Sequence, residues 1–159
     1  MKMKVQEMNV DNKRIVLRCD FNVPIKDGVI LDDTKIVASL ETINYLVSKN
    51  CRVIILSHLG KVKSEEDKSK NSLAVVAKRL NELVESNVIF STTTRSPELE
   101  MRVKALQPRE ILVVENTRFE DYPQKLESGN DIQLASYWAS LGDIFVMDAF
   151  GSSHRCHAS

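Results

Sequence analysis

The stretch that decides the fold is residues 14–31, RIVLRCDFNVPIKDGVIL. It begins with a short apolar run, residues 14–17, of the kind that forms a buried strand. Polar side chains follow the run directly, and then apolar residues 23–25 and 29–31 flank the sequence KDG at 26–28. An Asp-Gly pair between two apolar runs predicts a hairpin with a tight turn. The stretch therefore predicts a buried strand, a polar segment at its carboxyl end and a small hairpin.

Similar apolar runs recur along the chain, with helical patterns between them. They lie at residues 52–56, 87–90, 111–114 and 144–147. Alternating β and α segments are typical of a mostly parallel sheet that helices cover on both faces. The expected fold class is α/β: a three-layer, doubly wound, mostly parallel sheet of five strands with four helices on its two faces.

Two of the expected helices show an apolar face, and the other two show helix-start signals. The apolar faces consist of Ile36, Leu40, Ile43 and Val47, after capping residues Asp32 and Asp33, and of Leu73, Val76, Leu80, Leu83 and Val84. The sequence SPE at 96–98 is a strong helix start, and that helix should end near Leu106.

The last helix is expected over residues 131–141 and should bury Ile132, Ala135 and Trp138. It should stop at Gly142, where a left-handed cap suits glycine. Residues 61–71 are rich in charge and poor in apolar side chains, which predicts a solvated loop.

Composition limits the classes of function. A chain of 159 residues with 43% hydrophobic content fits one globular domain. The 22 basic and 22 acidic residues balance, so no overall field draws the protein to nucleic acid or to an anionic membrane. The three cysteines form no CxxC pair, the start carries no apolar signal region, and no run of about 18 apolar residues occurs. We expect a cytoplasmic protein.

Residues that follow the predicted strands are rich in functional groups. Ligands of open parallel sheets bind outside the carboxyl ends of the strands. The residues found there are Asp20 and Asn22, then Ser57, His58, Gly60 and Lys61, then Glu115, Asn116 and Arg118, and finally Asp148, His154 and Arg155. Lys35 joins this set from the first turn of the first helix, where its positive charge interacts unfavourably with the helix dipole. A ligand anion beside Lys35 would compensate this unfavourable interaction.

If these ends converge, they make a strongly basic site. Four permanent cations, Lys35, Lys61, Arg118 and Arg155, would face one carboxylate, Asp20. A phosphate, which is nearly doubly charged at neutral pH, together with one carboxylate would balance them. Arginine forks suit both groups, and Asp20 with Asn22 suits a hydroxyl. The chemistry predicts a small phosphorylated hydroxy acid as the ligand.

Each of these residues also has a purely structural interpretation. A single arginine or lysine at a strand end is more often a solvated surface charge. Asp20 could cap a turn, His58 could bond to backbone in its loop, Asp148 could fix the Gly151 loop, and Glu115 could pair with a neighbouring arginine. The joint occurrence at four strand ends favours the site.

Metal and nucleotide sites find little support. Residues 154–157, HRCH, bring a thiol and two imidazoles together, but no matching ligand pair occurs elsewhere in the sequence. The DAFG sequence at 148–151 lacks the other protein-kinase signatures. The five glycines are too scattered for a phosphate-binding loop.

At these same residues the chain resembles the phosphoglycerate kinase family. The resemblance rests on RCDFNVP at 18–24 with the hairpin and DTKI that follow it, SHLGK at 57–61, ENTRF at 115–119 and DAFGSSHR at 148–155, in the family's order. It covers essentially all 159 residues. It implies the amino-terminal domain of that family.

The resemblance assigns roles to single residues. It implies that Asp20 and Asn22 contact the glycerate end of 3-phosphoglycerate, and that His58, Arg118 and Arg155, with Lys61, hold its phosphate. Phe21, Lys35, Leu59 and Gly60 are further substrate-binding residues that it implies. Lys35 and Arg155 are the implied catalytic residues. Lys35 stands where the family usually has an arginine, and lysine loses the planar fork. Lys61 also stands where many members carry arginine.

The resemblance also implies a domain arrangement and a reaction. Residues 1–159 would be the domain that binds 3-phosphoglycerate, and the carboxyl-terminal domain that binds Mg-ADP or Mg-ATP would be absent from this chain. The full enzyme, expected to be monomeric, exchanges a phosphoryl group between 1,3-bisphosphoglycerate and ADP, and this chain alone should be inactive. It should bind neither nucleic acid nor membrane.

Two other interpretations are open. One is a stand-alone, non-catalytic anion-binding or regulatory module. The other is a flavodoxin-like receiver domain that uses Asp20 or Asp148, which leaves the arginines unexplained.

Overall fold

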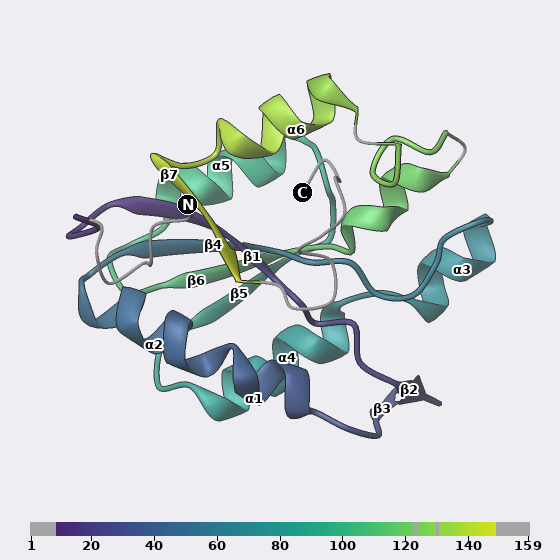
Figure 1. The fold of residues 1–159 in the computed structure, drawn as a ribbon, viewed down its shortest axis with the longest axis horizontal. Helices are drawn as coiled ribbons and strands as arrows, with labels where there is room; N and C mark the ends of the chain where they lie inside the picture. Colours follow the sequence, from purple (N-terminus) through teal and green to yellow (C-terminus); the bar gives the residue numbers. More distant parts are fainter. Residues whose placement is uncertain (1–8, 123, 130, 149–159) are drawn as a thin grey trace.

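A five-stranded parallel sheet forms the centre of the molecule. The computed structural model describes residues 9–122, 124–129 and 131–148 (Figure 1). The strands are β1 (Arg14–Cys19), β4 (Arg52–Leu56), β5 (Val88–Ser91), β6 (Ile111–Val114) and β7 (Ile144–Asp148). Their order is β5-β6-β4-β1-β7, and all neighbours pair in parallel. The five predicted strands and the α/β fold class are confirmed.

Helices cover both faces of this sheet (Figure 1). One face carries α1 (Thr34–Ala38), α2 (Leu40–Ser48) and α4 (Ala74–Leu83). The other carries α5 (Pro97–Ala105) and α6 (Ile132–Ala139). Connections between parallel strands are right-handed. The helices α1, α2 and α4 between β1 and β5, where the chain moves across the sheet in one direction, therefore lie on one face, and the helices between β5 and β7, where it moves back, lie on the other.

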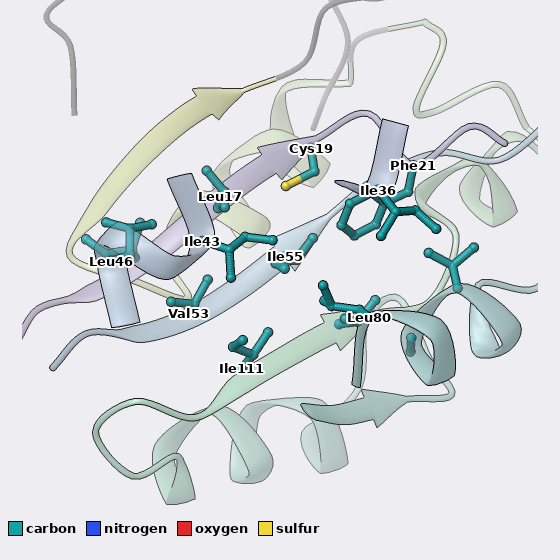
Figure 2. Close-up of a cluster of buried hydrophobic side chains, with 14 of the residues drawn as sticks. Leu17, Cys19, Phe21, Ile36, Ile43, Leu46, Val53, Ile55, Leu80 and Ile111 are labelled. Carbon is teal, nitrogen blue, oxygen red and sulfur yellow. The ribbon is translucent and has the colours of Figure 1, made fainter. Parts of the chain in front are cut away.

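The alternation of side chains along β1 explains why the strand is apolar throughout. Leu17 and Cys19 point to one face and pack with Ile43 and Ile55 (Figure 2). Val16 points to the other face and joins the second core cluster. Because both faces are buried, almost every position of the strand must be apolar. The strand ends are thereby fixed in a rigid frame.

The hairpin has the predicted turn. It consists of β2 (Ile25–Lys26) and β3 (Val29–Ile30), which pair in antiparallel fashion. Asp27 and Gly28 both have positive φ, 52° and 77°. That combination is the turn that Asp-Gly favours in two-residue hairpins.

The first predicted helix is broken in two at Ser39. The Ser39 hydroxyl donates a hydrogen bond of 2.6 Å to the carbonyl of Ile36, and its amide bonds to the same oxygen. Serine side chains compete with the helical hydrogen-bond pattern in this way. The apolar face continues from α1 into α2, so the periodicity did not reveal the break.

The prediction of a loop over residues 61–71 is wrong, because α3 (Glu65–Lys70) forms there. The Ser64 hydroxyl caps it by accepting from the amide of Asp67. Acidic residues occupy its first turn and lysines its last, which complements the helix dipole. None of its residues is buried, so hydrophobic periodicity gave no signal.

The last helix lies where predicted, but its buried face differs. Trp138 and Leu134 are fully buried, whereas Ile132 is 80% exposed. Gly142 does not adopt a left-handed conformation. A Cβ there would lie 2.9 Å from the carbonyl oxygen of Arg14 and from a methyl group of Val16, so close approach to β1 explains the glycine.

Membrane spanning requires about 20 apolar residues in one helix. The described helices include none that meets this requirement.

Candidate anion-binding site

The ends of three neighbouring strands, β1, β4 and β6, bring most of the predicted site residues to one edge of the sheet. These residues are Asp20, Phe21, Asn22, Ser57, His58, Leu59, Gly60, Lys61, Glu115, Asn116 and Arg118, with Lys35 added from α1. Asp148 closes β7 beside Cys19 of β1. His154 and Arg155 were also predicted for this site, and they lie outside the described residues.

The side chain of Asn116 joins the loop after β4 to the loop after β6. Its Oδ1 accepts hydrogen bonds from the amides of Leu59 at 3.1 Å and Arg118 at 3.0 Å. Its Nδ2 donates to the carbonyls of Leu59 at 2.7 Å and Asn71 at 2.8 Å. Asn116 is fully buried, and these four bonds use all the hydrogen-bonding capacity of its amide. The two loops therefore form one rigid unit.

Further hydrogen bonds attach the loop after β1 to this unit. The Oδ1 of Asn22 accepts from the amide of Gly60 at 2.8 Å, and the Ser57 hydroxyl accepts from the amide of Phe21 at 2.9 Å. Thr117 donates to the Ser57 carbonyl through both its amide and its hydroxyl. Residues 36 or more positions apart are thus held within hydrogen-bond distance.

Gly60 is required at the centre of this unit. Its φ is +61°, and a Cβ would lie about 3.0 Å from the side chain of Asn71. The Asn71 amide group also donates to the carbonyl of Lys61 at 3.0 Å. Residues 60 and 61 are therefore fixed by the side chain of Asn71, which directly follows α3. Asn71 was not among the predicted site residues.

Arg118 is the cation that sits on the junction of the loops. Its Nη1 lies 3.3 Å from the carbonyl oxygen of Gly60. Its Nε is buried and has no hydrogen-bond partner among the residues that the structure describes. A guanidinium has five donors in a planar fork that matches carboxylate and phosphate oxygens. The side chain is half-buried, so its stem is fixed while donors are still available for an anion.

Lys35 is paired with Asp20. Its Nζ lies 3.3 Å from Asp20 Oδ2, and the carboxylate is nearly buried while the lysine is 48% exposed. The prediction that a ligand anion compensates the charge of Lys35 therefore needs correction, because Asp20 already does so. Lys61, by contrast, is exposed and forms no ion pair with any residue in the described part of the chain.

Two buried charges of the site, Arg18 and Glu127, were not predicted as site residues. Arg18 is 1% exposed, and its Nη2 lies 2.9 Å from Nδ1 of His58. Burial lowers the pKa of Arg18 below its usual value, and the carboxylate of Glu127 opposes that effect. Arg18 could have been recognised from the sequence, because it is a charged residue two positions after Val16, on the same face of a strand predicted to be buried. Glu127 gave no signal, because its loop has no periodicity.

Glu115 has a structural partner, but that partner is the start of α4 and not an arginine. Its carboxylate accepts from the Ser72 hydroxyl at 2.6 Å and from the amides of Leu73 at 2.7 Å and Asn116 at 2.8 Å. Burial raises the pKa of Glu115 above its usual 4.5. The residue connects α4 to β6 beneath the site.

The positive excess among the described residues is smaller than predicted. Arg18 adds a buried cation to Lys35, Lys61 and Arg118, while Glu115 and Glu127 add two buried carboxylates to Asp20. No three His, Cys, Asp or Glu side chains of the described residues cluster closely enough to hold a metal ion. The predicted HRCH candidate at 154–157 lies outside the part of the chain that the structure describes.

A doubly wound parallel sheet with connected, cation-bearing loops at its carboxyl edge defines an α/β protein of the class whose ligands bind at that edge. The comparisons with known proteins agree with this class. The family model for phosphoglycerate kinase matches residues 5–159. The chain belongs to the phosphoglycerate kinase family.

Curated proteins named phosphoglycerate kinase are similar to this chain over nearly its whole length. The phosphoglycerate kinase of Lacticaseibacillus casei is 54% identical over 158 residues, and that of Listeria innocua is 55% identical. The matches cover 99% of this chain and 40% of each relative, so the chain spans about two fifths of their length.

Solved structures show the same fold. The phosphoglycerate kinase of Coxiella burnetii has a TM-score of 0.80 at 38% identity, with 98% of this chain and 37% of that chain covered. The enzyme of Pyrococcus horikoshii has a TM-score of 0.82 at 28% identity, with 99% and 39% covered. The family interpretation is supported over the stand-alone module and the receiver domain.

Replacement of Asn116 should loosen the site and destabilise the fold. Asn116→Ala removes four hydrogen bonds and leaves buried backbone groups of Leu59 without partners. We expect the free energy of unfolding to fall by about 2 to 4 kcal/mol in urea titrations. Asn44→Ala, on the exposed side of α2, is the control and should change it by less than about 0.5 kcal/mol. Equal effects of the two variants would contradict the central role of Asn116.

The raised pKa of Glu115 predicts a pH-dependent contribution to stability. The folded protein binds this proton more tightly than the unfolded chain does. The contribution is therefore fully present below the usual pKa of 4.5 and is lost as pH rises through the raised pKa of the folded state. Relative to Glu115→Gln, wild-type unfolding free energy should decrease as pH rises from about 4.5 towards 7, in urea titrations at several pH values.

Glu110→Gln is the matched control for this experiment. Hydrogen bonding to the Gln107 amide lowers the pKa of Glu110 below 4.5. Its contribution is fully present above that value and is lost as pH falls through the lowered pKa. The slope for Glu110 should therefore have the opposite sign and should appear below about pH 4.5, so the urea titrations are extended to that range. Slopes of the same sign for both variants would show that burial does not control Glu115.

Proposed function

We propose that residues 1–159 form the amino-terminal, 3-phosphoglycerate-binding domain of a phosphoglycerate kinase. The full enzyme would transfer a phosphoryl group between 1,3-bisphosphoglycerate and ADP to give 3-phosphoglycerate and ATP. The observation that carries the proposal is the position of Arg118, whose guanidinium lies at the joined ends of β4 and β6 with a buried Nε that has no described partner. Membership of the family supplies the identity of the acid.

In this proposal the site divides between the two ends of the ligand. Arg118, Lys61 and His58 face the phosphate, with the backbone of Leu59 and Gly60 between them. A phosphate accepts bidentate bonds from a guanidinium and a point charge from an ammonium. Lys61 suits the second role because its exposed side chain is free of ion pairs in the described residues.

The glycerate end would lie beside the loop after β1. Asp20 and Asn22, with Phe21 between them, are proposed to contact the hydroxyl and carboxylate. Asn22 Oδ1 already accepts from the Gly60 amide, so its carboxamide is held with a fixed orientation. Positioning of this kind, more than covalent chemistry, is what phosphoryl transfer requires from a protein.

Lys35 and Arg155 are the proposed catalytic residues. Lys35 is held 3.3 Å from Asp20, and its side chain is 48% exposed, so it can leave the carboxylate for a more highly charged phosphoryl group. Cations placed where charge develops in the transition state supply most of the catalysis in such reactions. The role of Arg155 rests on the family motif alone.

The nucleotide would bind elsewhere in the full enzyme. Mg-ADP or Mg-ATP requires oxygen ligands for the magnesium, and the described residues contain no cluster of three potential ligands. On the basis of family membership we assign the nucleotide to a further domain of a full-length, monomeric, cytoplasmic enzyme. That domain and the acid substrate are the partners proposed for this chain, with no role for nucleic acid or membrane.

Calorimetric titration with 3-phosphoglycerate tests the proposal. The folded wild-type chain should bind the acid, and Arg118→Ala should weaken binding about 10- to 100-fold, because charge-assisted hydrogen bonds contribute about 1.5 to 3 kcal/mol. Arg102→Ala is the control, since Arg102 is a surface residue of α5 that pairs only loosely with Glu98, at 3.7 Å. Unphosphorylated glycerate should bind at least tenfold more weakly than the phosphorylated acid.

Two outcomes would contradict this function. One is the absence of any heat of binding for wild-type protein whose circular dichroism shows it to be folded. The other is an affinity that Arg118→Ala leaves unchanged.

A further inference from the structure

Arg18 is an unusual residue for its position. It lies within β1, whose other central residues form the core, and only 1% of its surface is exposed. Val16, two residues earlier on the same face, packs in the second core cluster. Taking a guanidinium out of water costs free energy unless partners compensate it. Its partners therefore indicate what the charge does.

One partner is the imidazole of His58. The Arg18 Nη2 and His58 Nδ1 are 2.9 Å apart, and the His58 ring is itself largely buried. A guanidinium can only donate hydrogen bonds, so Nδ1 must accept this one. An Nδ1 that accepts carries no proton. The proton of the neutral ring is therefore on Nε2.

The same contact opposes a second proton on the ring. Protonation of Nδ1 would place two N–H donors against each other and would set an imidazolium beside a buried guanidinium. The charged groups coupled to Arg18 are Glu127 from the loop after β6, Arg118 from the same segment, and Asp20 from the end of β1. Glu127 is fully buried, and its carboxylate compensates the charge of Arg18. Arg18 therefore stays a charged donor in its hydrogen bond to His58.

We propose that Arg18 is a positioning residue of the anion site, which holds His58 as a neutral imidazole with its proton on Nε2. His58 then offers the ligand one N–H donor of fixed orientation, whose presence does not depend on pH near neutrality. The inference deepens the proposed function, since it concerns the same site. Arg18 itself acts through His58 and through its pairing with Glu127.

Nitrogen-15 NMR of the histidine side chains tests this inference without any ligand. In the wild-type chain, the correlation spectra should show His58 with a bare Nδ1 and a protonated Nε2. This pattern should persist as pH is lowered from 8 to about 5.5, a range in which an unperturbed histidine becomes charged at about pH 6.5. The His58→Gln variant assigns the signal, because the chain has three histidines.

The key variant is the double replacement Arg18→Met with Glu127→Gln. Removing both charges avoids a buried carboxylate without compensation, which the single variant would leave. In the double variant, His58 should titrate near pH 6.5, and the affinity for 3-phosphoglycerate at pH 7.5 should fall about tenfold. Arg14→Met is the matched control: the same residue type on the same strand and face, at the opposite end of β1. It should leave the His58 spectrum and the affinity unchanged.

The inference is overturned if wild-type His58 titrates near pH 6.5, if its proton is on Nδ1, or if the double variant changes neither the spectrum nor the affinity. Its failure can be told apart from failure of the proposed function. A titrating His58 with normal 3-phosphoglycerate binding counts against Arg18 alone. A neutral His58 in a chain that does not bind the acid counts against the proposed function alone.

Discussion

The hydrogen bonds of a single carboxamide, that of Asn116, hold the candidate site together. They join the loop after β4 to the loop after β6, and the Asn22 carboxamide then attaches the loop after β1 through Gly60. Because the amide is buried, no water can replace these bonds, and each loop can take only one position relative to the others. The hydrogen bonds between the loops therefore fix the backbone that carries the cations of the site.

The sheet makes this arrangement possible. Strands buried on both faces give the loops a rigid base, and parallel order brings the ends of β1, β4 and β6 to the same edge (Figure 1). Charges at that edge are arranged in two ways. Arg18 is compensated inside the protein by His58 and Glu127, so it serves the organisation of the site. Arg118 has a buried Nε without a hydrogen-bond partner among the described residues, and Lys35 is half-exposed beside a nearly buried Asp20, so these two can respond to a ligand.

Much of the fold followed from the sequence because burial controls it. The five strands and the helices with apolar faces were predicted from periodicity, and the Asp27-Gly28 turn from its chemistry. The helix α3 was missed because a cap and charge order form it, not burial. In the site, Asn22, His58 and Arg118 were found by their place after strands. Glu127 was not, because its role depends on electrostatic attraction to Arg18, more than 100 positions away, which no local pattern reveals. The roles of His154 and Arg155 stay predictions.

Three loops, joined by hydrogen bonds, are proposed to form one anion site. Backbone amide NMR of the chain during titration with 3-phosphoglycerate tests it most directly. If the three loops form one site, the amides of residues 20–22, 58–61 and 116–118 should shift together, with one dissociation constant. Shifts confined to a single loop, separate dissociation constants for the three loops, or shifts only at the hollow of about 630 Å³ between the hairpin and α4 would contradict it.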